Sequence, residues 1–334
     1  MGSMHPTRRG LTGAALAAAL GAVARPSSAA APVPEAATLL APGPEDGPEA
    51  RLAARAAAAL ARGLVQAAAV RVSVLGGPDG ITAANRFASS SAPDGRVLLM
   101  LPGLAVQAQL VGDSRARYEP RQWPALCASL QAAVVAGRGA PADGTPLRIA
   151  LPSPGAPEVA ALLALDLLGR RATPIFGLSG TAAEAAVRQG QADALVLCGA
   201  APGPRAASLG LSAWFAFDAA GGVRDPMAPE IPALGDLLPD PHRPDLLDAA
   251  RAAGAALRAR ALLVLPPLTA ADVVALWRGA AQKWVEETPG ALDDGARRAG
   301  PAEATVLSTT LCAPADIALA YREWLLRRLN WRAA

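Results

Sequence analysis

The chain has 334 residues, of which 52% are hydrophobic, 31 are Lys or Arg, 28 are Asp or Glu and only two are His. A chain of this length and apolar content buries a large core, in one large domain or two lobes, and is not disordered. The formal net charge of +3 is matched by Arg8, Arg9 and Arg25 near the N-terminus. The rest of the chain is close to neutral and has no basic cluster interleaved with aromatic residues, so nucleic-acid binding is disfavoured.

Residues 1–31 have the pattern of an export signal. Arg8-Arg9 precede an apolar run over 11–24, and small residues follow up to Ala31. The run is shorter than the roughly 20 residues that a membrane-spanning helix needs. Residues 7–11 resemble a twin-arginine translocation signal, and an ordinary secretory leader with paired arginines is the alternative. No cysteine follows that would carry a lipid anchor, so we expect cleavage near Ala31 and a periplasmic location.

Strands and helices alternate through the next part of the chain. Residues 38–41 form a short predicted strand, and a Pro/Gly turn leads to a predicted helix over 48–64 with proline in its first turn. A strand over 69–76, a helix over 81–90 and a strand over 97–101 follow. This order predicts a mostly parallel sheet with helices on both faces.

The alternation continues after a long apolar run over 123–137. The further predicted elements are a strand, turn and helix over 146–169, a strand, turn, helix and strand over 172–199, strands over 209–218 and 256–267, a helix over 268–287 and a last helix over 314–328. Thr269 is the expected N-cap of the helix over 268–287, and Asp272 lies in its first turn. These elements predict a second α/β lobe.

Four loops that join a strand to a helix are rich in Gly and Pro: 41–50, 76–84, 152–159 and 177–184. In open α/β sheets ligands bind where strands end, because the free N–H groups of helix N-termini face a crevice there. Together the loops predict a pocket of backbone donors suited to an anionic or carbonyl-bearing ligand. The alternative for any one loop is a tight turn without a ligand.

Several kinds of catalytic or cofactor site are not supported by the sequence. The loops contain neither a P-loop nor a G-x-G-x-x-G fingerprint, which disfavours a nucleotide cofactor. Ser179 lies in a glycine-flanked turn, but with His5 in the export signal only His242 remains, so no nucleophile and base pair or multi-His metal site is expected. Cys127, Cys198 and Cys312 lie in apolar contexts, and an oxidising compartment would permit one disulfide among them.

The order of these motifs resembles the periplasmic substrate-binding proteins of tripartite tricarboxylate transporters, the Bug-type receptors. The resemblance runs in sequence order from Thr38 to Trp324, and its segments are 39–60, 76–100, 118–130, 180–196 and 229–239. The most specific match is Ala92-Pro93-Asp94-Gly95, followed by Leu98-Leu99, in the family's A-x-P-D-G-x-x-L-L segment.

The resemblance implies a two-lobed α/β fold, the type II periplasmic-binding-protein fold, with crossover strands between the lobes. Residues 38–125 with about 263–334 would form the first lobe, and about 126–262 the second. Such a receptor is a monomer without catalysis or cofactor that closes on a small organic solute, usually a carboxylate, and presents it to membrane permease subunits. The ligand-binding residues that it implies here are Gly43, Pro44, Asp46, Gly47, Gly77, Pro78, Asp79, Gly80, Ser153, Gly155, Ala156, Ser179, Gly180 and Thr181.

The sequence departs from the family at the loops that would hold the ligand. Glu45 and Asp46 intrude into the first loop, residues 155–159 lack the family's serine and histidine, and residues 177–180 lack its aromatic residue and cation. These changes favour a less acidic solute, neutral, aromatic or amide-bearing, or a divergent receptor that has lost ligand affinity. A sensor partner that binds a kinase's outer domain, and a secreted hydrolase without histidine, remain as alternatives.

Overall fold

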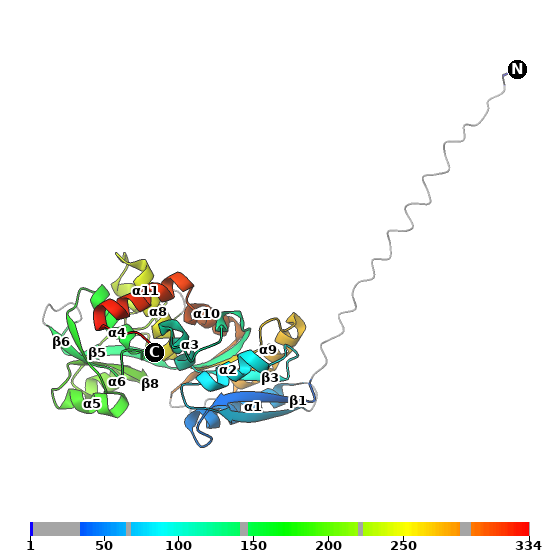
Figure 1. The fold of residues 1–334 in the computed structure, drawn as a ribbon, viewed down its shortest axis with the longest axis horizontal. Coiled ribbons are helices and arrows are strands. Elements are labelled where there is room, and N and C mark those ends of the chain that lie inside the picture. The colour runs from blue at the N-terminus through cyan, green and yellow to red at the C-terminus, as the bar shows by residue number, and fades with distance from the viewer. Residues whose placement is uncertain (3–33, 65–67, 141–145, 220–222, 288–294, 334) are drawn as a thin grey trace. The chain divides into compact units, whose positions relative to one another are not determined.

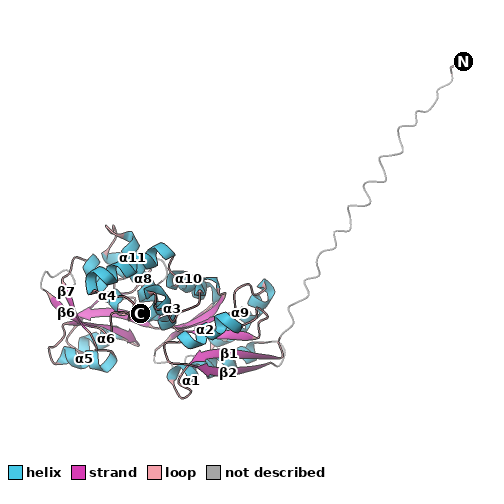
Figure 2. Ribbon diagram, in the orientation of Figure 1, coloured by secondary structure: helices cyan, strands magenta, loops and turns pink. Residues whose placement is uncertain are grey.

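The structure is a computed structural model, and it describes residues 1–2, 34–64, 68–140, 146–219, 223–287 and 295–333. The expected export signal, apart from its first two residues, lies outside the described residues. Over the described part of residues 33–334 the chain forms two β-sheets, each with helices packed on both faces (Figures 1 and 2). The two-lobed α/β fold class is therefore confirmed.

The larger sheet has the strand order β11-β4-β10-β3-β1-β2. Its strands are β1 (Ala36–Pro42), β2 (Ala69–Leu75), β3 (Val97–Leu101), β4 (Ala125–Leu130), β10 (Ala259–Val264) and β11 (Arg297–Ala299). β1 runs parallel to β2 and β3, whereas β10 runs antiparallel to β3 and β4. Alternate residues of β3 face opposite sides, so that Leu98 and Met100 enter one hydrophobic cluster and Leu99 and Leu101 another.

The smaller sheet has the order β7-β6-β8-β5-β9. Its strands are β5 (Ala132–Gly137), β6 (Leu147–Ala150), β7 (Ala172–Ile175), β8 (Ala194–Gly199) and β9 (Ser212–Ala216). β6 pairs in parallel with β7 and β8, and β5 is antiparallel to β8 and β9. Both sheets are mixed: the antiparallel pairs involve β5 in the smaller sheet and β10 and β11 in the larger one, and the other pairs are parallel.

The helices form layers on the faces of the two sheets. On the larger sheet, α1 (Pro48–Gly63) and α9 (Ala271–Glu286) cover one face, and α2 (Ile81–Ser90), α3 (Gly103–Val111) and α10 (Pro301–Leu311) the other. On the smaller sheet, α4 (Val159–Leu167), α8 (Pro244–Arg258) and α11 (Ala315–Leu329) pack on one face, and α5 (Gly180–Arg188) and α6 (Pro202–Ser208) on the other. Short helices lie at Pro120–Gln122 and at α7 (Leu234–Leu237).

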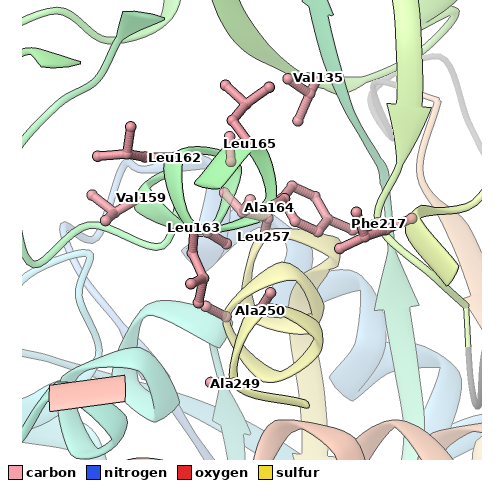
Figure 3. Packing of buried hydrophobic residues seen from close by; sticks show 14 of the residues in the cluster. Val135, Val159, Leu162, Leu163, Ala164, Leu165, Phe217, Ala249, Ala250 and Leu257 are labelled. Carbon is pink, nitrogen blue, oxygen red and sulfur yellow. The ribbon is translucent and has the colours of Figure 1, made fainter. Parts of the chain in front are cut away.

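Helix α4 is the centre of the core beside the smaller sheet. Every residue from Val159 to Leu165 is buried, because the helix is enclosed by the sheet on one side and by α8 on the other. In Figure 3, Leu163 of α4 points toward Ala250 of α8, where small side chains let the two helices approach closely. A helix that is apolar all round is typical of such a buried position.

The sequence-based elements differ from the structure in several places. α3, α6, α8 and α10 were not predicted, and the strand expected over 256–267 begins only at Ala259 because α8 continues to Arg258. The expected N-cap Thr269 is also wrong: α9 begins at Ala271, and the Thr269 hydroxyl donates to the Pro266 carbonyl at 2.7 Å. No single described helix is long and apolar enough to cross a membrane, and α10 and α11 reach that length only as a pair bent by 52°.

The chain crosses between the sheets at two adjacent points. β4 and β5 form one buried extended run, and Gln131 lies between them. The Gln131 backbone N–H donates to the Arg258 carbonyl at 2.9 Å, and its side-chain amide donates to the Leu257 carbonyl at 2.8 Å. The first crossing thus falls at 131 and the return at 258–259, whereas the expected boundaries lay near 126 and 262. α11, which was assigned to the first lobe, packs in the core beside the smaller sheet.

Candidate functional site

A cavity of about 620 Å³ lies between elements of the two sheets. One wall is α3, which follows β3 of the larger sheet, and the facing wall is the loop 152–158, which joins β6 of the smaller sheet to α4. Asp79 and the turn 113–115 add to the first wall, and Ser179 and Trp331 add to the second. This volume is suited to a small organic molecule.

A hydrogen bond crosses this cavity from one wall to the other. The Gln107 side chain, only 2% exposed on α3, donates from Nε2 to the Gly155 carbonyl at 3.2 Å. Gly155 is also closely covered by Trp331, because a Cβ added at residue 155 would lie 2.8 Å from the indole ring. A side chain at this position would therefore force the Trp331 ring to shift.

Arg115 lines the cavity beside two carboxylates. Its Nη2 lies 2.7 Å from Asp113 Oδ2, and its Nη1 lies 3.4 Å from Asp79 Oδ2. The hydrogen bonds from Arg115 lower the pKa of Asp113, and those to Asp113 raise the pKa of Arg115. Asp79 also accepts from the Ile81 N–H at 3.2 Å and so occupies the N-terminus of α2. The positive charge of Arg115 is thus already matched by the protein's own acids.

Glu158 lines the opposite wall, immediately before α4. It is half-buried, and no described residue forms an ion pair with its carboxylate. Burial raises its pKa, and a hydrogen bond from its own backbone N–H opposes that shift. The carboxylate lies at the positive end of the α4 dipole, which favours its ionised form.

The structure brings some of the sequence-predicted site residues together. Ser153, Gly155 and Ala156 line the cavity, together with Asp79 and Ser179. The other site residues predicted in these loops do not line it: Gly77, Pro78, Gly80, Gly180 and Thr181. Gly80 has φ 73° as the N-cap of α2, which explains the need for glycine there.

The first predicted loop, between β1 and α1, lies apart from this cavity. Gly43, Pro44, Asp46 and Gly47 are not among its lining residues. Gly43 packs against the Gly76 carbonyl, which a Cβ at 43 would approach to 2.2 Å, and Pro44 and Asp46 are exposed. Here the glycine serves the packing of one loop on another.

Reasoning from the sequence did not find Gln107, Arg115, Glu158 or Trp331. Gln107 is on a helix that was not predicted, and Trp331 follows the last helix, where nothing in the sequence indicates a contact with residue 155. The Asp-Ser-Arg turn at 113–115 was a detectable signal, since it combines both charges directly after an apolar segment.

Other groups of chemical interest lie elsewhere. Cys127, Cys198 and Cys312 are free thiols in the structure, and burial raises the pKa of Cys198 and of Cys312 to about 12. His242 is exposed and does not line the cavity. Across the described ranges, no three His, Cys, Asp or Glu side chains are grouped so as to hold a metal ion.

This chain is similar in fold to solved structures that include solute-binding proteins. A TctC solute-binding protein from Polaromonas, without ligand, has a TM-score of 0.62 at 16% identity, over 88% of this chain and 98% of that one. The periplasmic binding protein BugD has a TM-score of 0.52 at 16% identity, over 90% of this chain and 100% of its own. A Rhodopseudomonas palustris protein with adipate has a TM-score of 0.53 at 14% identity, over 91% and 100%.

No protein-family model and no curated protein matches the sequence. The fold is that of the periplasmic solute-binding proteins, two α/β lobes with a cavity between them. Two of the structures reported above are a TctC and a Bug protein, which is the type that the sequence motifs resemble.

Proposed function

We propose that this protein is an exported solute receptor of the tripartite tricarboxylate transporter type. It captures a small organic solute, a carboxylate or a related compound, between its two lobes and delivers it to the permease subunits of a membrane transporter. The observation that carries this proposal is the cavity of about 620 Å³ that both lobes line, bridged by Gln107 and Gly155. The shared fold with TctC and BugD, and a protein of that fold that binds the diacid adipate, support it.

The loops around the cavity support binding rather than catalysis. Its ionisable lining residues are Asp79, Asp113, Arg115 and Glu158, and among the described residues no hydrogen bond joins any of them to a Ser, Cys or His side chain that it would activate. A secreted hydrolase without histidine is therefore the weaker alternative. Turnover of chromogenic esters or glycosides by the purified protein would support that alternative and contradict the proposal.

Two further parts of the proposal concern partners and location. The protein acts as a monomer that is exported after recognition of Arg8-Arg9 and cleaved near Ala31. Replacement of both arginines by lysine should leave the precursor in the cytoplasm if the twin-arginine route is used, and N-terminal sequencing of the mature protein locates the cleavage. A ligand-dependent sensor partner is the alternative to transport, and pull-down of permease subunits or of a sensor kinase separates the two.

Native mass spectrometry of the protein purified from its own periplasm tests the central claim. We expect a small molecule bound to the wild-type protein. Ser153→Trp should abolish this binding, because the indole would fill the cavity that Ser153 lines. Ser208→Trp is the matched control, since Ser208 is equally an exposed serine and lies outside the cavity. Retention of the molecule by Ser153→Trp, or equal loss from both variants, contradicts binding in this cavity.

A further inference from the structure

The charge of the cavity indicates which class of solute it accepts, an inference that rests on the proposed function. We propose that the cavity selects a solute that presents an ammonium group to Glu158, and that it discriminates against dianions. Glu158 acts as the specificity-determining residue. The inference follows from three features of the described residues: the hydrogen-bonded N–H groups at the start of α4, the ion pairs that Arg115 already forms, and the position of Trp331 on the wall that contains Glu158.

The first three N–H groups of α4 are not free to bind an anion. The N–H groups of Val159 and Ala160 donate to the carbonyls of Ala156 and Pro157, at 3.1 and 3.0 Å, and the Ala161 N–H donates to the Glu158 carbonyl at 3.0 Å. A helix N-terminus binds anions through free N–H groups, and these three are already used. The Glu158 carboxylate itself occupies the positive end of the helix. A ligand carboxylate would meet a like charge there.

The opposite wall does not supply a free cation. Arg115 is the one basic side chain among the described residues that line the cavity, and Asp113 and Asp79 lie within ion-pair distance of it. Three acidic residues and one arginine therefore line the cavity. Arg115 is matched by Asp113, whereas the Glu158 carboxylate forms no ion pair with any described residue, and a solute cation is what would neutralise it.

Trp331 provides an aromatic surface on the same wall as Glu158. Its ring lies against Gly155, three residues before Glu158, and it also lines the cavity. An ammonium group beside an indole face gains from the quadrupole of the ring as well as from a nearby carboxylate. An apolar methylene chain would also pack on the ring. The wall is therefore suited to an alkyl ammonium group.

A matched set of six-carbon compounds tests this inference: adipate, 6-aminohexanoate, 1,6-diaminohexane and adipamide. These molecules have the same chain length and differ in the charge of their ends. Calorimetry with the mature protein at pH 7 should show that both ammonium compounds bind about tenfold or more tightly than adipate, the size expected of one partly buried charge pair. The affinity for adipamide, which is neutral, should lie between the affinity for adipate and the affinities for the two ammonium compounds.

The variant Glu158→Gln tests whether Glu158 causes the preference for ammonium compounds over adipate. The variant keeps the size and hydrogen-bonding capacity of the side chain and should reduce the ratio of ammonium to adipate affinity by about tenfold. Glu45→Gln, at an exposed position outside the cavity, should leave the ratio unchanged. Circular dichroism and the melting temperature of each variant establish that it is folded.

The outcomes separate this inference from the proposed function. Tightest binding of adipate by the wild-type protein, or an unchanged ratio in Glu158→Gln, overturns the inference and leaves a solute receptor in place. Lack of binding by either ammonium compound also overturns it. The native mass spectrometry of the periplasmic protein, with its Ser153→Trp variant, decides the receptor function independently.

Discussion

The ion pair between Arg258 and Asp225 lies at the point where the chain returns from the smaller sheet to the larger one. The Arg258 Nε lies 2.9 Å from Asp225 Oδ2, and the two side chains are 3% and 0% exposed. Arg258 also donates to the Asp218 carbonyl at 3.2 Å, and Asp225 Oδ1 accepts from the Met227 N–H at 2.9 Å. Removal of either partner therefore leaves the other buried charge without its ion pair.

We expect Asp225→Ala to lower the free energy of unfolding by about 3–5 kcal/mol, the usual cost of breaking a buried pair at one end. A shift in melting temperature of about 2 °C for each kcal/mol in a large chain gives a decrease of about 6–10 °C. Urea unfolding followed by far-UV circular dichroism measures the first quantity, and differential scanning calorimetry the second.

The double variant Asp225→Leu with Arg258→Met tests the physical reason. Apolar replacement of both partners removes the desolvation cost together with the attraction, so the double variant should be more stable than Asp225→Ala and near the wild type. Glu323→Gln is the control, because its pair with Arg327 is exposed and should contribute less than about 1 kcal/mol. A loss below about 1 kcal/mol in Asp225→Ala, or a double variant as unstable as the single one, would refute the reasoning.

Three other predictions concern the cavity and the thiols. Gly155→Ala should destabilise the protein by about 1–3 kcal/mol, because its Cβ would lie 2.8 Å from Trp331, and Trp331→Ala should relieve that cost in a double-mutant cycle measured by urea unfolding. In the absence of ligand, Glu158→Gln should raise the melting temperature at pH 7 more than at pH 4. Burial raises the folded-state pKa of Glu158, so ionisation of this residue destabilises the fold as the pH rises. Equal shifts in melting temperature at both pH values would contradict this. Cys198 and Cys312, whose thiols are protonated at pH 8, should react with Ellman's reagent only after unfolding, and rapid reaction of the native protein would contradict their burial.

The sequence predicts the elements best where local signals and packing agree. The helix over 48–64 has proline at its start, and the structure places α1 at Pro48–Gly63. In contrast, the apolar run over 123–137 contains two strands that belong to different sheets, and Gln131 is the single polar residue between them. Nothing local in such a run shows that the chain leaves one sheet for another, because both halves are fully buried and equally apolar.

The helices that were missed have two different causes. α8 begins with Pro244-Asp245 and ends at Arg258, which are a start and a stop signal, but its last residues run directly into the apolar strand that follows. α3 is short and almost entirely buried, and its nine residues show no amphipathic period. Its place in the structure depends on tertiary contacts with α8 and α11.

The candidate site was predictable only where it follows the ends of strands. The loops that contain Asp79, Ser153 and Ser179 were found because glycine and proline mark the turn from strand to helix. Gln107 and Trp331 reach the same cavity from a buried helix and from the C-terminal segment, far away in sequence. Their convergence results from the packing of α3 and α11 on α8, which no local pattern records.

The charge of the cavity is set by single side chains on an architecture that leaves them free to vary. Asp79 lies before α2 and Glu158 before α4, so that each of these helices meets a carboxylate of the protein where an anionic ligand would be attracted. The turns around them depend on backbone hydrogen bonds and on glycine, and replacement of Glu158 by a neutral residue would keep them. The shared fold therefore does not set the charge of a solute, which has to be read from the residues that line the cavity.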